Sequence, residues 1–129
     1  MISYGFKKEL NVPYEEAVAK ATEALQKEGF GVLTRIDIKE KLKDKLSVDF
    51  NKYVILGACM PANAYKALQA EPDIGLMLPC NVIIYEARGK TIFAVIKPTV
   101  AMQSIGNKAL EGTASEVEAL LKKVFDAVT

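Results

Sequence analysis

The chain has 129 residues, 50% of them hydrophobic and 26% charged, which is typical of one folded domain spanning residues 1–129 and excludes a disordered or fibrous protein. Its 17 basic and 16 acidic residues leave a formal charge of +1, so we expect neither nucleic acid nor a membrane surface as a partner. Histidine is absent, which excludes imidazole-dependent triads, dyads and metal sites within the chain.

The apolar segments predict a cytoplasmic protein. The N-terminal sequence MISYGFKKEL has no hydrophobic region of the length found in signal peptides. The two most apolar runs, 53–64 and 74–85, are interrupted by Pro61 and Pro79 and are shorter than the roughly 20 residues that cross a bilayer. In a reducing compartment, two cysteines are more often free thiols, ligands or redox groups than a structural disulfide.

The first half of the chain predicts two strands and two helices. Residues 2–10 alternate between apolar and polar and predict a strand, and residues 13–28 have helical spacing with Gly29 as a stop. Residues 30–37 alternate again and predict a second strand with its even-numbered side chains on one face. Residues 37–50 predict an amphipathic helix whose charged outer face is solvated, which we prefer to a basic binding patch.

The second half predicts a buried strand, a helix, a hairpin and a final helix. Residues 53–59 are apolar on both faces, and Pro61 is suited to begin the helix that follows. Residues 81–97 predict two strands joined by a turn at Arg88, Gly89 and Lys90. The last helix has two possible capping boxes, Thr113 with Glu116 and Ser115 with Glu118. The fold class is therefore α+β, with a single twisted sheet of about five strands, mixed or mainly antiparallel, packed with three or four helices.

Both cysteines lie at boundaries between predicted elements. Cys59 ends the buried strand just before a helix that begins at Pro61, and helix N-termini favour the thiolate form of cysteine. Cys80 follows Pro79 at the start of the hairpin. If these two strands are neighbours, the intervening helix returns the chain and brings the sulfur atoms near each other. The alternative for each cysteine is that it packs as a small hydrophobic residue.

The segments GACMPANAYKAL and GLMLPCN resemble the signature of the family known as domain of unknown function 302, and the resemblance extends over nearly the whole chain. It implies a small α+β domain, a homodimer, and no established reaction or catalytic residues. The matching positions are Gly57, Cys59, Pro61, Ala64, Leu68, Glu71, Pro72, Gly75, Pro79, Cys80 and Asn81.

Three functional hypotheses follow, and the residues identify no cofactor. The first is a binding module in which candidate residues line a pocket for a small molecule or a metal ion. The candidates are Cys59, Met60, Glu71, Cys80 and Asn81. A metal would be held by Cys59 and Cys80, which supply half of a tetrahedral zinc set, or with Met60 or Met77 as soft donors for Cu(I).

The second hypothesis is a thiol enzyme or redox carrier, with Cys59 as nucleophile and Cys80 as the resolving thiol. Without histidine, activation would come from the helix terminus or from a lysine such as Lys66 or Lys97. The third is a structural interaction domain, a homodimer with packed, inert cysteines, in which apolar residues on both faces of the central strands contribute to the subunit interface. Whether the chain is an enzyme is left open by its sequence.

Overall fold

The computed structural model of the chain describes residues 2–129, so Met1, which the predicted domain includes, lies outside the described residues. It contains a five-stranded sheet in the order β1-β5-β4-β3-β2, and all four strand pairings are antiparallel. The α+β class and the single sheet are therefore confirmed. The strands are β1 (Gly5–Leu10), β2 (Gly31–Asp37), β3 (Tyr53–Cys59), β4 (Cys80–Ala87) and β5 (Lys90–Ile96).

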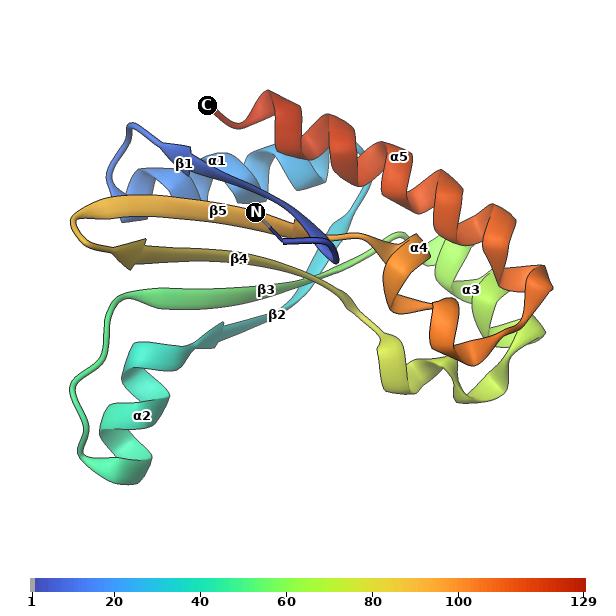
Figure 1. Cartoon of the computed structure of the whole chain (residues 1–129), viewed down its shortest axis with the longest axis horizontal. Helices are drawn as coiled ribbons and strands as arrows, with labels where there is room; N and C mark the ends of the chain where they lie inside the picture. The colour runs from blue at the N-terminus through green and yellow to red at the C-terminus, as the bar shows by residue number, and fades with distance from the viewer. Residues whose placement is uncertain (1) are drawn as a thin grey trace.

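Helical segments connect the strands and follow the sheet along the chain (Figure 1). The α-helices are α1 (Tyr14–Lys27), α2 (Ile38–Leu46), α3 (Pro61–Ala70), α4 (Pro98–Ala101) and α5 (Glu111–Ala127). The 3₁₀ helices are η1 (Pro72–Met77), η2 (Gln103–Ile105) and η3 (Lys108–Leu110). The segment from α4 to η3 was not predicted, because turns of three or four residues are too short to produce an apolar period.

The main core lies between the sheet and the two long helices, α1 and α5, which pack on the same face (Figure 1). Residues paired across antiparallel strands point to the same side of a sheet, so each strand gives alternate residues to this core. Helix α1 ends where predicted, since Gly29 adopts a φ of 90° and the amide of Phe30 donates to the carbonyl of Leu25 at 2.9 Å. The most deeply buried strand residues are Val54, Leu56, Val82, Ile84, Phe93 and Val95.

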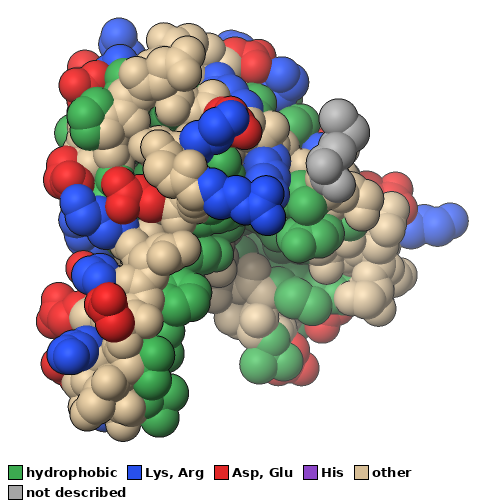
Figure 2. All heavy atoms as spheres, turned by 60° about the vertical axis from the view of Figure 1, so that its left-hand side comes forward, with side chains coloured by type: hydrophobic (Ala, Val, Ile, Leu, Met, Phe, Trp, Pro, Cys, Tyr) green, Lys and Arg blue, Asp and Glu red, His purple; other side chains and the backbone are tan. Residues whose placement is uncertain are grey.

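The opposite side of the sheet is also apolar, and we call it the open face. The register aligns Ile36, Ile55, Ile83 and Ala94 across four strands. Beside this row, the rings of Tyr53 and Tyr85 stack with their centroids 5.0 Å apart. Helix α2 projects beyond this side of the sheet at one end, and η1 at the other (Figure 1). Hydrophobic side chains gather in the hollow beside α2 (Figure 2).

Two local predictions were wrong. The even-numbered residues of β2 do not share one face, because the register shifts between Val32 and Thr34, which places an extra residue, Leu33, in the strand. The last helix begins at Glu111 rather than at Thr113 or Ser115, so neither predicted capping box forms at its start. Tertiary contacts use the two glutamates instead, since Glu116 accepts from Asn63 and Glu118 from Thr99.

Within residues 2–129, no helix combines the length and the hydrophobicity that a membrane crossing requires.

Gly57 is expected to be intolerant of substitution. A Cβ at this position would overlap Thr34 Oγ1 and lie 2.6 Å from Pro79 Cγ. Gly57→Ala should therefore lower the free energy of unfolding by about 1–3 kcal/mol, the usual cost of overpacking, in a urea titration followed by circular dichroism.

Gly75→Ala is the matched control, because a Cβ there would meet no atom within 4 Å and Gly75 does not adopt a positive φ. We expect the free energy of unfolding of this variant to stay within about 0.5 kcal/mol of the wild-type value. Equal effects of the two substitutions would contradict the close approach of Pro79 to the strand.

Candidate functional site

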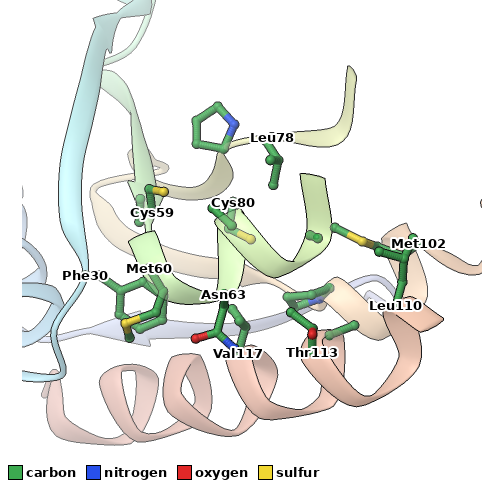
Figure 3. Close-up of a pocket in the computed structure, with 16 residues that line it drawn as sticks. Phe30, Cys59, Met60, Asn63, Leu78, Cys80, Met102, Leu110, Thr113 and Val117 are labelled. Atoms are coloured by element: carbon green, nitrogen blue, oxygen red, sulfur yellow. The ribbon is translucent and has the colours of Figure 1, made fainter. Parts of the chain in front are cut away.

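A small cavity lies at the end of the sheet where β3 stops and β4 starts (Figure 3). Its free volume is about 40 Å³, and its walls come from these strand ends, from α3, from the turn before β4, and from α4, η3 and α5. We call it the cysteine cavity, because both cysteines line it. Since one water needs roughly 10–15 Å³ by this measure, the cavity has room for a few atoms rather than for a drug-sized ligand.

The register of β3 and β4 brings the two cysteines together. Cys80 is paired with Ala58 and shares its side of the sheet, whereas Cys59 is the next residue along β3 and alternates to the other side. Both nevertheless reach the cavity, because α3 and the segment Leu78–Pro79 wrap around the end of the two strands. β3 and β4 are therefore neighbours and both cysteines line one cavity, while the close approach of their sulfur atoms stays a prediction. Both are free thiols.

The environment of Cys80 favours the protonated thiol. Burial raises the pKa of Cys80 to about 11, and the nearby Cys59 adds to the rise. At neutral pH, Cys80 is therefore a neutral, weakly polar group on an apolar wall rather than a nucleophile. Helix α3 begins after Cys59, with Met60 as its N-cap and Pro61 in its first turn, so Cys59 is the thiol that lies closer to a helix N-terminus.

The remaining lining is apolar, with two polar side chains. Met60 and Met102 bring their thioethers to the wall, so four sulfur-containing residues surround one cavity. Asn63, which is 8% exposed, donates from Nδ2 to Glu116 Oε2 at 3.2 Å, an orientation that leaves its amide oxygen as an acceptor. Thr113 lies on the α5 side (Figure 3).

Of the predicted binding residues, Cys59, Met60 and Cys80 line the cavity, whereas Glu71 and Asn81 do not. Glu71 accepts a hydrogen bond from Asn107 Nδ2 at 3.2 Å, and so holds the loop before η3. Asn81 is exposed on the open face, where its register partner is Gly57. Both positions of the family signature therefore lie outside the cavity, and within the described part of the chain only Glu71 of the two makes a side-chain hydrogen bond.

The described residues do not provide a complete metal site. Within residues 2–129, no group of three or more His, Cys, Asp or Glu side chains lies close enough to hold a metal ion. Met77, a predicted soft donor, is 41% exposed and lies outside the cavity lining. A metal bound by Cys59 and Cys80 would therefore need Met60, Met102, solvent or a second molecule to complete its coordination.

Comparison with known proteins identifies the fold and the family. The family model for the domain of unknown function DUF302 matches residues 6–128. The chain belongs to the DUF302 family. A crystal structure of an uncharacterized conserved DUF302 protein from Bacillus stearothermophilus superimposes with a TM-score of 0.91 at 29% sequence identity, covering 99% of this chain and 100% of that chain. No curated protein matches the sequence.

Sequence reasoning missed the far wall of the cavity in this DUF302 chain. This wall comes from the C-cap of α4, from η3 and from α5, more than twenty residues after Cys80, and is formed by Met102, Leu110, Ala114 and Val117. Their local pattern is that of ordinary packing residues, and the segment carrying the first two was not predicted to be helical. Only the return of the chain after β5 brings them opposite the cysteines.

The raised pKa of Cys80 predicts a distinctive reaction profile. In a Cys59→Ser variant, we expect the rate of alkylation by iodoacetamide to rise about tenfold per pH unit from pH 7 to 10, because the thiolate fraction keeps increasing until about pH 11. The rate is measured by intact-mass spectrometry. The same variant in urea, where the thiol is solvated, should level off near its ordinary pKa of 9. A plateau below pH 9 in the folded protein would contradict this.

Proposed function

We propose that this DUF302 domain is a binding module whose cysteine cavity accepts a small, largely apolar group, with Cys59 and Cys80 on its wall. The observation that carries this proposal is the cavity itself, a space of about 40 Å³ lined by both cysteines at the end of two strands. An apolar space of this kind favours an apolar occupant, because filling it adds van der Waals contacts that the empty walls lack. Asn63 donates to Glu116 and so fixes the α3 wall of the cavity against α5.

The same geometry gives less support to the two chemical alternatives. A metal ion would meet two cysteines and two methionines, but one of the thiols would first have to lose a proton with a pKa of about 11. A redox carrier would use Cys80 as the resolving thiol, and a raised pKa makes it a slow attacking group at neutral pH. A thiol enzyme would therefore depend on Cys59 alone.

Xenon tests whether the cavity binds an apolar group, because xenon enters dry apolar cavities without needing a polar contact. With ¹³C-labelled methionine methyl groups observed by NMR under xenon pressure, we expect saturable shifts for Met60 and Met102. Met77 lies outside the cavity and serves as the internal control.

A matched pair of substitutions on α3 completes this test. Ala64→Ile places extra atoms on the cavity wall and should abolish the xenon shifts, whereas Ala62→Ile changes an exposed residue of the same helix and should preserve them. Wild-type protein without xenon shifts at Met60 and Met102 would refute a ligand-accepting cavity.

We further propose that two copies of the chain associate through the open face. Helix α2 supports this, because its apolar residues are spaced to form one stripe, yet every side chain in it remains at least partly exposed. Exposed apolar residues continue from β2 through α2 into the next loop, namely Leu33, Ile36, Leu46, Val48 and Phe50. Leu76 and Met77 of η1 are exposed on the other projection beside the sheet.

A second copy is the occupant that this surface fits best. Exposed apolar residues lie on both projections, at either end of the sheet, and a standard interface buries about 800 Å² on each partner. A two-fold arrangement would let the α2 of each copy cover the open sheet of the other, so that the same surface is used twice.

Sedimentation velocity over a range of concentrations tests this association. We expect wild-type protein to be dimeric at micromolar concentration and Leu46→Lys to weaken the dimer at least about tenfold, because each interface would bury two new charges. Asp44→Lys introduces the same side chain on the outer side of α2 and should leave the dimer intact. Wild-type protein that stays monomeric at all concentrations would refute the proposal.

A further inference from the structure

A second hollow lies directly behind the wall of the cysteine cavity. It has a free volume of about 540 Å³ and is lined by residues from α4 to the first turns of α5, and we call it the outer groove. Its polar side chains include Gln103, Asn107, Lys108, Glu111 and Ser115. Lys108 and Glu111 carry opposite charges, so the groove is polar without a strong net charge.

Three residues form both the wall of the cysteine cavity and the wall of the outer groove. Met102, Leu110 and Ala114 line both spaces. Leu110 and Ala114 are buried at 2% and 5% exposure, whereas Met102 is partly exposed. The two spaces therefore share these three side chains, and Met102 is the most exposed of the three.

Met102 caps the C-terminus of α4, and side-chain hydrogen bonds hold the segment around it at two points. At one end, the amide and hydroxyl of Thr99 donate to Glu118 Oε1 at 3.0 and 2.6 Å. At the other, Asn107 Nδ2 donates to the carbonyl of Ala70 at 3.1 Å. Between these anchors lie the rest of α4, where the amide of Met102 donates to the carbonyl of Pro98 at 3.0 Å, then the short turn η2, and then Gly106, whose φ is 70°.

The three-residue turn that follows Met102, η2, can open locally at low cost. Short 3₁₀ turns have few internal hydrogen bonds, and regions of this kind lie at the low-stability end of a folded protein. Methionine is also the most adaptable apolar side chain, with three rotatable bonds and no branch. A rotation of Met102 would join the two spaces without disturbing the sheet or α5.

We propose that the cysteine cavity and the outer groove form one site for a short-chain amphiphile. Met102 is the gating residue of this site, because rotation of its side chain opens a passage between the two spaces. The amphiphile's unbranched alkyl chain of a few carbons occupies the cysteine cavity, and an uncharged hydrogen-bonding head lies among Gln103, Asn107 and Ser115. This inference rests on the proposed function, that the cavity accepts an apolar group. The opposite charges of Lys108 and Glu111 give the groove no net charge from this pair, which favours an uncharged head over an anionic or a cationic one.

The ligand class is tested with 1-butanol, by the methionine methyl shifts already described for xenon. We expect 1-butanol to shift Met60 and Met102 saturably, and to bind more tightly than butyrate or butylammonium. Gln103→Ala and Ser115→Ala should each raise the dissociation constant for 1-butanol by about two- to tenfold, the usual effect of losing one hydrogen bond. Neither substitution should change xenon binding.

The gating role of Met102 is tested by the rate at which a small neutral reagent modifies Cys80 in the Cys59→Ser variant. The Cys80 thiolate attacks the sulfenyl sulfur of methyl methanethiosulfonate, a mixed disulfide forms and methanesulfinate leaves. Met102→Ala should raise this rate at least about tenfold at pH 9. Met102→Leu, which keeps the wall, should not raise it, and neither should Met77→Ala outside the site.

The outcomes separate the two proposals. Xenon binding together with 1-butanol binding that responds to the groove variants supports one joined site. Xenon binding without such 1-butanol binding would refute the joined site for an amphiphile and leave the proposed function standing. If Met102→Ala leaves the rate of Cys80 modification unchanged, Met102 does not gate the passage. An absence of xenon shifts would refute the proposed function, on which both inferences depend.

Discussion

One-sided packing of the long helices is the constraint on which the rest of this structure depends. Helices α1 and α5 cover a single face of the sheet and bury Val54, Ile84 and Phe93 almost completely. The chain makes its other connections at the ends of the strands, where α2, α3 and η1 extend beyond the sheet (Figure 1). This arrangement leaves a cavity at one end of the sheet and one apolar face uncovered, because the short elements lie at the ends of the strands and do not cover that face.

The cysteine cavity forms because segments that are distant in sequence return to the same end of the sheet, and no local motif encodes it. The pairing of Ala58 with Cys80 closes the 21-residue excursion that carries α3 and η1. Helix α5 then supplies the far wall after the hairpin, and polar contacts hold the layers together, as Asn63 bonds to Glu116 and Thr99 to Glu118. Since the walls come from separate segments, cavity size depends on how they pack and not on one residue.

Much of this architecture was readable from residue patterns, and the exceptions have physical causes. Alternation predicted the strands, and Gly29 marked the end of α1, because both signals arise within a few residues. The capping boxes at the start of α5 failed because Glu116 and Glu118 form contacts with α3 and α4 that are distant in sequence. The cysteines were found as a pair, whereas Met102 and Leu110 were not, since nothing in their neighbours indicates which strand end they face.

The edges of the sheet limit how the protein can assemble. One edge, β1, carries the exposed charges of Lys7 and Glu9, and the other, β2, is interrupted by the extra residue Leu33. Charges and bulges at an edge discourage the addition of further strands from other molecules. Both edges therefore disfavour growth of the sheet by strand addition, so the face-to-face association that we propose would end in a closed particle rather than a fibre.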